Sequence, residues 1–246
     1  MGYDMFLFFG HGEGDNGAVG NGYTELELVR SLTLNCVTLL ENKGIKVLTN
    51  VKNGFNNFNR NLTNGQEIKY KMGATLHLNS ASDSSANGSE IIVPCKEKYL
   101  NIEEEILNQY KKIGFNIRGI KSRDYSSEKF LIRENGSIVN YTNYYKEIRN
   151  AWDNGYSLSI IETCFISNKN DVNLFIKNMN KIAKIIVNAY LKEMGKETYK
   201  IEEVTKTETS QSDKIYRVIC GSFKDKSNAE KRVKELKNKG FESFIM

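Results

Sequence analysis

The sequence predicts an α/β protein whose core is a mostly parallel, twisted sheet with helices on both faces. Short apolar runs of strand length alternate with amphipathic helical patterns over the first 195 residues. Alternation of strand and helix patterns of this kind is typical of a mostly parallel sheet covered by helices. The chain has 246 residues, of which 39% are hydrophobic and only one is proline, so it can form a substantial core.

Six apolar runs have the length of β-strands. They lie at residues 3–9, 45–49, 74–78, 90–93, 130–133 and 157–161. Loops rich in glycine or serine follow the first and third of these runs, as expected where a buried strand ends at a surface.

Four helices are expected between the strands, at residues 24–43, 61–71, 102–113 and 170–192. In the first, Val29, Leu32 and Cys36 recur at helical spacing, and Gly44 follows as a common C-terminal cap. The last is the longest, with an apolar stripe along one face.

The composition changes after residue 195. Residues 196–214 are polar and charged, which predicts a linker between a catalytic domain at 1–195 and a small unit at 215–246. That unit reads as a strand at 216–220, a helix at 227–239 and a strand at 241–245, a small α+β arrangement of the βαβ type.

Charge and hydropathy exclude several classes of protein. The net charge is only +5, and no basic run with interleaved aromatic residues occurs, so we expect no nucleic-acid partner. No apolar stretch approaches the length of a membrane helix, and the first residues lack a secretory signal, so we expect no membrane insertion and a cytoplasmic protein until release. The four cysteines form no metal-binding pair and are expected to be reduced core residues: Cys36, Cys95, Cys164 and Cys220.

Both histidines of the chain follow apolar runs. His11 comes after the first strand and His77 lies at the end of the third, while Glu162 ends the last strand. Ligands and catalytic groups collect at the carboxyl ends of strands in such sheets. Two imidazoles and a carboxylate at one edge are the parts of a hydrolytic zinc site with an open position.

Glu25 is the natural third ligand because it begins the first helix, just past the glycine-rich loop that carries His11. Glu27 would face away if Glu25 faces the metal, since two residues correspond to about 200° around a helix. Glu13 lies in the loop itself and is the other alternative. Zinc lowers the pKa of bound water and polarises a carbonyl, and Glu162 is then the candidate general base.

Five motifs occur in the order found in a known family. They are Gly-His-Gly with Asp-Asn-Gly-Ala-Val-Gly at 10–12 and 15–20, Thr-Glu-Leu-Glu at 24–27, Leu-His-Leu-Asn at 76–79, Asn-Gly-Ser-Glu at 87–90, and Glu-Thr-Cys-Phe-Ile-Ser-Asn with a later aspartate at 162–171. In these motifs, residues 3–192 resemble the zinc-dependent N-acetylmuramoyl-L-alanine amidases of bacterial cell walls. The departures, at Glu13, Asn16 and Cys164, remove no ligand.

The resemblance implies that His11, Glu25 and His77 bind one Zn²⁺ and that Glu162 is the catalytic base. It implies cleavage of the amide between N-acetylmuramic acid and the L-alanine of the peptidoglycan stem peptide. Further residues of the motifs are implied to bind substrate or to support the ligands: Asn79, Asn87, Glu90 and Asn168.

Residues 215–246 resemble the first half of a SPOR domain, through Tyr-Arg-Val-Ile-Cys-Gly-Ser-Phe at 216–223 and Gly-Phe at 240–241. SPOR domains bind glycan strands, so this unit is expected to bind the wall or to pair two chains into a homodimer. We expect a bacteriolytic phage endolysin. The alternatives are a sporulation autolysin of the mother cell, an inactive wall-binding module, and a zinc peptidase on a similar sheet.

Overall fold

The computed structural model describes residues 2–12, 14–51, 67–201 and 225–238. The chain divides into two compact units, Met1–Glu202 and Glu203–Met246. Each is considered by itself.

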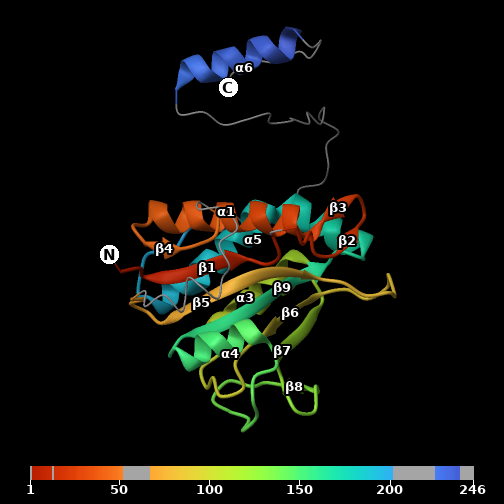
Figure 1. Cartoon of the computed structure of the whole chain (residues 1–246), viewed down its shortest axis with the longest axis vertical. Helices are drawn as coiled ribbons and strands as arrows, with labels where there is room; N and C mark the ends of the chain where they lie inside the picture. Colours follow the sequence, from red (N-terminus) through yellow and green to blue (C-terminus); the bar gives the residue numbers. More distant parts are fainter. Residues whose placement is uncertain (1, 13, 52–66, 202–224, 239–246) are drawn as a thin grey trace. The chain divides into compact units, whose positions relative to one another are not determined.

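A seven-stranded sheet in the order β4-β1-β5-β9-β6-β7-β8 is the centre of the first unit (Figure 1). The strands are β1 (Met5–Phe9), β4 (Val47–Leu48), β5 (Met72–Asn79), β6 (Ser89–Ile92), β7 (Ile117–Arg123), β8 (Phe130–Ile132) and β9 (Ser157–Phe165). Four neighbouring pairs are parallel, whereas β6 runs antiparallel to β9 and β8 antiparallel to β7. The predicted α/β class with a mostly parallel sheet is therefore confirmed.

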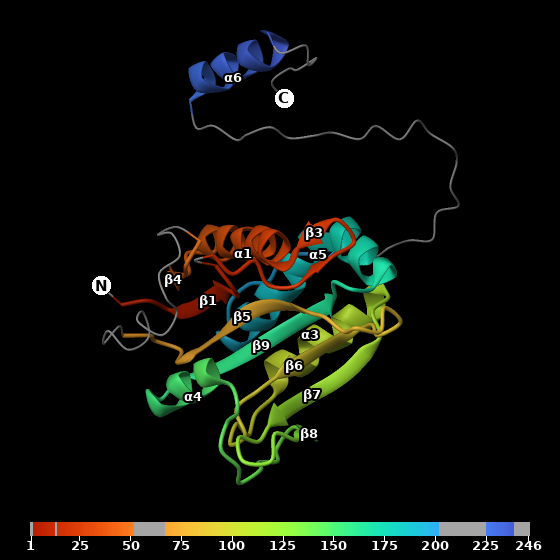
Figure 2. The ribbon, with the colours of Figure 1, turned by 45° about the vertical axis from the view of Figure 1, so that its right-hand side comes forward.

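Helices cover both faces of this sheet, as predicted (Figure 1, Figure 2). The larger core lies under α1 (Glu25–Asn42), α3 (Asn101–Ile113) and α5 (Lys169–Glu193). A smaller core on the other face contains Phe6, Phe8 and Ile160 and is covered by α4 (Lys146–Asp153). A short hairpin of β2 (Val19–Gly20) and β3 (Tyr23–Thr24) precedes α1.

One expected helix is absent from the described residues, and a strand and a helix were not expected. The helix predicted at 61–71 is absent from its described part, because Ile68 bridges Tyr3 and the chain turns before β5. Strand β7 and helix α4 were not predicted at all. The rest of the expected helix, residues 61–66, lies outside the described residues.

The register of β5, β9 and β6 determines which side chains lie next to one another on these three strands. His77 of β5 pairs with Glu162 of β9, and Glu162 pairs with Glu90 of β6. Side chains of directly paired residues project from the same face. The sheet therefore presents an imidazole and two carboxyls in a row across three strands.

The segment after α5 continues to pack on the first unit. Tyr199 exchanges two hydrogen bonds with Asn188, at 2.7 and 2.8 Å, and its hydroxyl donates to the Leu39 carbonyl at 2.7 Å. The compact unit thus extends to Glu202, past the limit expected at residue 195.

In the second unit, α6 (Lys226–Asn238) lies where a helix was predicted at 227–239. The strands expected at 216–220 and 241–245, and most of the linker expected at 196–214, lie outside the described residues. Over the described ranges, no helix combines the length and apolar character that crossing a membrane requires.

Candidate metal centre and catalytic site

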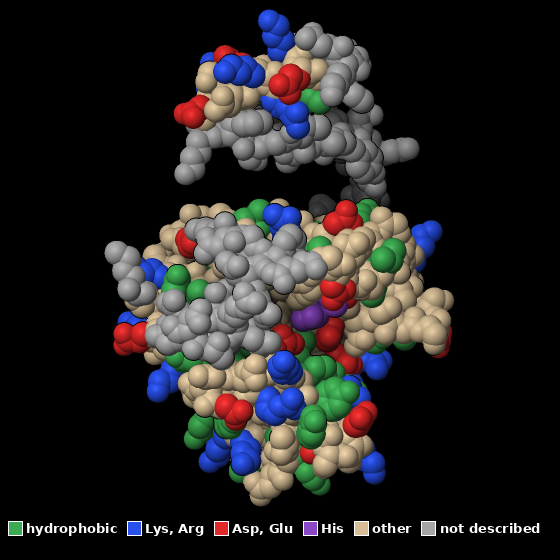
Figure 3. Space-filling view, in the orientation of Figure 1, with side chains coloured by type: hydrophobic (Ala, Val, Ile, Leu, Met, Phe, Trp, Pro, Cys, Tyr) green, Lys and Arg blue, Asp and Glu red, His purple; other side chains and the backbone are tan. Residues whose placement is uncertain are grey.

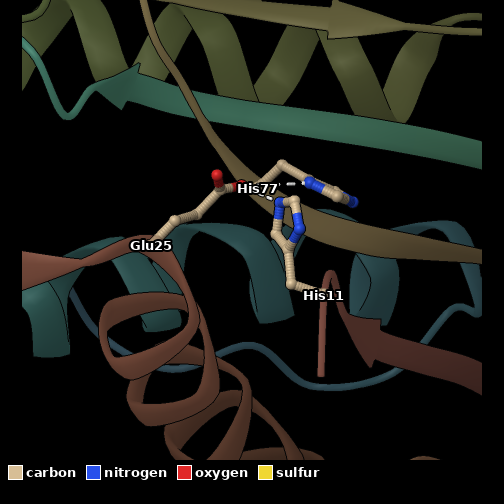
Figure 4. A group of neighbouring side chains, drawn as sticks. All are labelled: His11, Glu25 and His77. Carbon is tan, nitrogen blue, oxygen red and sulfur yellow. Dashed lines mark hydrogen bonds and ion pairs between the residues drawn. The ribbon is translucent and has the colours of Figure 1, made fainter. Parts of the chain in front are cut away.

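His11, Glu25 and His77 converge at the edge of the sheet (Figure 4). One ligand atom from each lies within 4.8 Å of the others. The Oε1 atom of Glu25 is 2.9 Å from His11 Nε2 and 3.1 Å from His77 Nδ1. Figure 3 shows the histidine side chains at the surface, with acidic side chains beside them. The three residues that the sequence nominated as ligands thus lie together.

Two glycines make room for the two imidazoles. A Cβ atom at Gly10 would lie 2.0 Å from His77 Cε1, and one at Gly17 would lie 2.7 Å from His11 Cδ2. His11 itself has φ of +67°, an unfavourable region for a residue with a side chain. Such strained backbone is characteristic of functional sites, where the surrounding structure has to hold it.

At the start of α1, the side chains of the two candidate glutamates point in different directions. Thr24 and Glu27 form a reciprocal capping box in which each side chain bonds to the backbone of the other. The Glu27 side chain therefore caps the helix on its exposed side. Glu25, in contrast, is only 3% exposed and faces the histidines. Glu13, the other alternative, lies outside the described residues.

Outer contacts hold the three ligands in place. Asp15 Oδ2 lies 2.8 Å from His11 Nδ1, which leaves His11 Nε2 to face Glu25. Backbone amides of Ala18 and Leu78 donate to the Glu25 carboxylate at 3.1 and 3.0 Å. Carboxylate and backbone partners of this kind orient metal-binding side chains.

The cluster shifts the pKa of each member. Burial alone would raise the pKa of Glu25, but its contacts with His11 and His77 outweigh burial and hold it far below the usual range. Contact with Glu25 raises the pKa of His11. Burial would lower the pKa of His77, yet Glu25 and the charges of Glu162 and Glu147 raise it to about 9. A divalent cation would replace these protons, because it needs neutral imidazoles.

Glu162 lies next to the cluster on the adjacent strand. Burial raises its pKa to about 7, opposed by the charge of His77 and assisted by Glu25, Glu90 and Glu147. Its Oε2 atom is buried without a hydrogen-bond partner, as is Nε2 of His77. A carboxyl with this pKa can exchange a proton near neutral pH.

Sequence reasoning missed Glu147. It lies in the first turn of α4, and its charge acts on both His77 and Glu162. Burial raises its own pKa. No motif contains it, and α4 is too short to stand out in the sequence; only the packing of α4 on the sheet brings this residue to the site.

Asn79 and Glu90 form a second group, in which Asn79 follows His77 by two residues on β5 and Glu90 pairs with Glu162 on β6. Glu90 accepts hydrogen bonds from Asn79 Nδ2 at 3.2 Å, from Arg118 Nε at 2.6 Å and from Lys121 Nζ at 2.7 Å. The two basic residues come from β7, the strand that was not predicted, so no pattern in the sequence indicated that they belong here.

The other two nominated residues support local structure. Asn168 caps α5 by accepting from the amides of Asn170 and Asp171, and its own amide donates to the Ser84 carbonyl at 2.9 Å. Asn87 donates to the Ser85 carbonyl at 2.8 Å. These hydrogen bonds join each residue to loop backbone or to a helix end rather than to His11, Glu25 or His77.

Three cysteines are described, and all are buried with free thiols: Cys36, Cys95 and Cys164. Burial raises the pKa of each thiol, and Cys164 in particular is well above its usual value. They behave as the expected core residues rather than as nucleophiles. Cys220 lies outside the described residues.

A model of the N-acetylmuramoyl-L-alanine amidase family matches residues 5–192. The chain belongs to this family. Its members are zinc-dependent hydrolases of peptidoglycan, and the cluster of His11, Glu25 and His77 is the candidate metal site in this amidase. A SPOR domain model matches residues 186–246, so the amidase also carries a C-terminal SPOR domain.

Two relatives in Bacillus subtilis differ in how much of their length the amidase spans. It is 23% identical to a sporulation-specific N-acetylmuramoyl-L-alanine amidase, over 98% of this chain and 84% of the relative. It is 24% identical to the N-acetylmuramoyl-L-alanine amidase LytC, over 70% of this chain but only 31% of that protein.

Solved structures share the fold of the first unit. Cwp6 from Clostridium difficile has a TM-score of 0.62 at 22% identity, covering 78% of this chain and 29% of that one. The catalytic domain of CwlV, an amidase from Bacillus (Paenibacillus) polymyxa, has a TM-score of 0.57 at 17% identity, covering 79% and 99%. These likenesses bear on the fold alone.

Proposed function

We propose that this chain hydrolyses the amide between N-acetylmuramic acid and L-alanine, with one zinc ion held by His11, Glu25 and His77 and with Glu162 as the general base. The observation that carries the proposal is the convergence of these three donors beside a buried carboxyl on the paired strand. The family's activity agrees with this chemistry.

The donor set fits zinc. Two imidazoles and one carboxylate are the usual protein ligands of a hydrolytic zinc ion. The nitrogens that face the Glu25 carboxylate, Nε2 of His11 and Nδ1 of His77, lie close enough to it for one cation to contact all three side chains. Bound zinc supplies Lewis acidity, polarising the substrate carbonyl and making water easier to deprotonate.

Glu162 carries the proton in this proposal. With a pKa of about 7 it is partly ionised at neutral pH, so it can accept a proton from the attacking water. The same carboxyl then donates that proton to the departing nitrogen of L-alanine.

Glu162→Gln tests this role because it keeps the shape of the side chain and removes the base. We expect the variant to bind zinc like the wild type but to lose at least about 100-fold in kcat. Zinc content by atomic absorption and release of L-alanine peptides by chromatography would measure the two effects. Unchanged turnover would exclude Glu162 as the base, and a wild type that binds walls without turnover would support an inactive binding module.

Asn79, Asn87, Glu90 and Asn168 remain proposed substrate-binding or supporting residues. Asn79 and Glu90 are better placed for substrate contact, since they flank Glu162 on the neighbouring strands. The described contacts of Asn87 and Asn168 favour a role in shaping the loops around the site.

Wall attachment is the proposed role of the C-terminal part, through its SPOR domain. We also propose pairing of two chains through residues 215–246, most of which lie outside the described residues. Light scattering of the full chain tests this proposal: a dimer mass that becomes a monomer mass after removal of 215–246 would support it, and equal monomer masses would contradict it.

Two biological roles are open to this amidase. Phage endolysin is the role inferred from the sequence, with a protein held in the cytoplasm until release. A role in lysis of the mother cell is favoured by the sporulation-specific relative, which aligns with 98% of this chain. Transcript levels during phage induction and during sporulation would distinguish the two roles.

A further inference from the structure

Arg118 is the extra residue of a β-bulge at the start of β7. Ser89 of β6 pairs with Ile117, but the next residue, Glu90, pairs with Gly119. Gly119 has φ of +93°, a conformation that glycine adopts readily. Bulges often redirect a side chain next to an active site. Here the bulge lets Arg118 reach Glu90, which faces the same side of the sheet as its partner Glu162.

The guanidinium of Arg118 is held on two sides. Its Nε donates to Glu90 Oε2 at 2.6 Å, and its central carbon lies 5.0 Å from the centroid of the Phe165 ring. Lys121 donates to the same carboxylate oxygen at 2.7 Å. Two cations therefore share one buried carboxylate, which leaves one positive charge in excess.

The outer part of this guanidinium is available to a ligand. The Arg118 side chain is 40% exposed, whereas that of Lys121 is 13% exposed. Within the described part of the chain, the two terminal amino groups of Arg118 have no hydrogen-bond partner. A guanidinium with its flat edge free matches a carboxylate, which it can bind with two parallel hydrogen bonds.

Its position relative to the catalytic residues is set by the sheet. Glu90 pairs directly with Glu162, which pairs with His77, so Arg118 lies beyond Glu162 on the side away from the metal ligands. Neighbouring strands are about 4.8 Å apart. One residue of extended peptide spans about 3.3–3.6 Å. Two residues of extended peptide span about 7 Å, so a group on the second residue past the cleaved bond can reach Arg118, which lies between about one and two strand spacings from Glu162.

The chemistry of the substrate suggests which group this is. Peptide linkage consumes the lactyl carboxyl of N-acetylmuramic acid, so carboxylates near the cleaved amide belong to the stem peptide. Its second residue is a D-glutamate joined through its γ-carboxyl, and its α-carboxyl is free in some walls and amidated in others. We propose that Arg118 binds this α-carboxylate and makes the enzyme prefer non-amidated stem peptides. This inference rests on the proposed function.

Two matched substrates, in which the γ-carboxyl is in amide linkage, test it with the zinc-loaded full chain: N-acetylmuramoyl-L-alanyl-γ-D-glutamyl-L-lysine and its counterpart with D-isoglutamine at the second position. We expect the wild type to favour the carboxylate substrate by about 10- to 100-fold in kcat/KM, mostly through KM, as for a charge-assisted hydrogen bond. Arg118→Gln should abolish the preference by slowing only the carboxylate substrate. Arg118→Lys, which keeps the charge beside Glu90, should retain part of it. Lys112→Gln, a surface charge of α3, is the control and should retain all of it.

Equal losses of kcat/KM on both substrates in Arg118→Gln would overturn the proposal, since they would mean that Arg118 supports the site rather than binding the α-carboxylate. A preference that survives in Arg118→Gln would overturn it as well. Calorimetric binding of the tripeptide L-alanyl-γ-D-glutamyl-L-lysine supplies a readout without turnover, and it should weaken in Arg118→Gln. If the wild type cleaves neither substrate, the proposed function fails, while the binding comparison still decides the role of Arg118.

Discussion

Neighbouring acidic residues take different roles at this site because the backbone directs them differently. Glu25 and Glu27 lie two positions apart, yet one contacts both histidines and the other closes a capping box. Glu162 and Glu25 also differ in pKa. Burial raises the pKa of Glu162, whereas contacts with His11 and His77 outweigh burial and lower the pKa of Glu25. Residue type alone does not assign a role; the direction of the side chain does.

Gly10→Ala tests the space reserved for His77. The added methyl group would lie 2.0 Å from the imidazole, so the ring must move, and we expect zinc affinity to fall about 10- to 100-fold. Competition with a chromogenic chelator measures this affinity. Gly155→Ala is the control for a general loss of stability, because its φ of +80° strains the backbone while its methyl group meets no atom within 4 Å. Equal affinities in the two variants would contradict the proposed packing.

The pH dependence of activity tests the environment of Glu162. A base with a pKa of about 7 is inactive when protonated, so kcat/KM should rise as the pH increases through 7. Glu147→Gln removes a charge that raises this pKa, and the rise should then occur at lower pH. A rise that stays in place or moves to higher pH in the variant would contradict the assigned electrostatics.

At the scale of elements, the beginnings of helices and the ends of strands hold the site. The capping box of α1 fixes the first turn, in which Glu25 lies. Thr24→Ala removes the cap and should lower the free energy of unfolding by about 1 kcal/mol, as measured in urea. Thr38→Ala in the same helix is the control, since Thr38 bonds only within the helix. A loss in Thr24→Ala no larger than in Thr38→Ala would contradict a stabilising cap.

Most helices and strands were predictable because their apolar residues either recur at helical spacing or form short runs of strand length. Residues 5–9 are continuously apolar and buried in β1, and the apolar residues of the run at 157–161 are buried in β9. By contrast, β7 reads Ile-Arg-Gly-Ile-Lys-Ser-Arg, with a half-exposed start and a bulge, so it lacks the pattern of a core strand. Arg118 and Lys121 of β7 bind Glu90, and these same charged residues deprive the strand of an apolar pattern in the sequence.

Some residues of the candidate site were likewise predictable from the sequence, and others were not. His11, His77 and Glu162 were predictable because each ends an apolar run, and Glu25 because it begins a helix beside the loop. Glu147 reaches the site only through the packing of α4, a long-range contact that leaves no local pattern. Asp15 had no assigned role until the fold of the loop brought it to His11.

At the scale of the whole molecule, the limit of the catalytic unit depends on Tyr199. This residue bonds to Asn188 of α5 and to the Leu39 carbonyl of α1, so it joins two helices. A chain ending at residue 202 should therefore unfold at a higher temperature than one ending at 195, by about 2–4 °C for each kcal/mol that residues 196–202 add to the free energy of unfolding. Calorimetry would measure both transition temperatures, and equal values would mean that this segment adds no stability.

The most direct test of the central claim is end-group analysis of purified cell walls digested by the full chain, with and without a chelator. We expect new amino-terminal alanine, no new reducing sugar, loss of the reaction with the chelator, and its return on addition of Zn²⁺. Release of carboxyl-terminal residues would indicate a peptidase instead, and wall binding without any new end group would contradict the assignment of His11, Glu25, His77 and Glu162 as a working catalytic site.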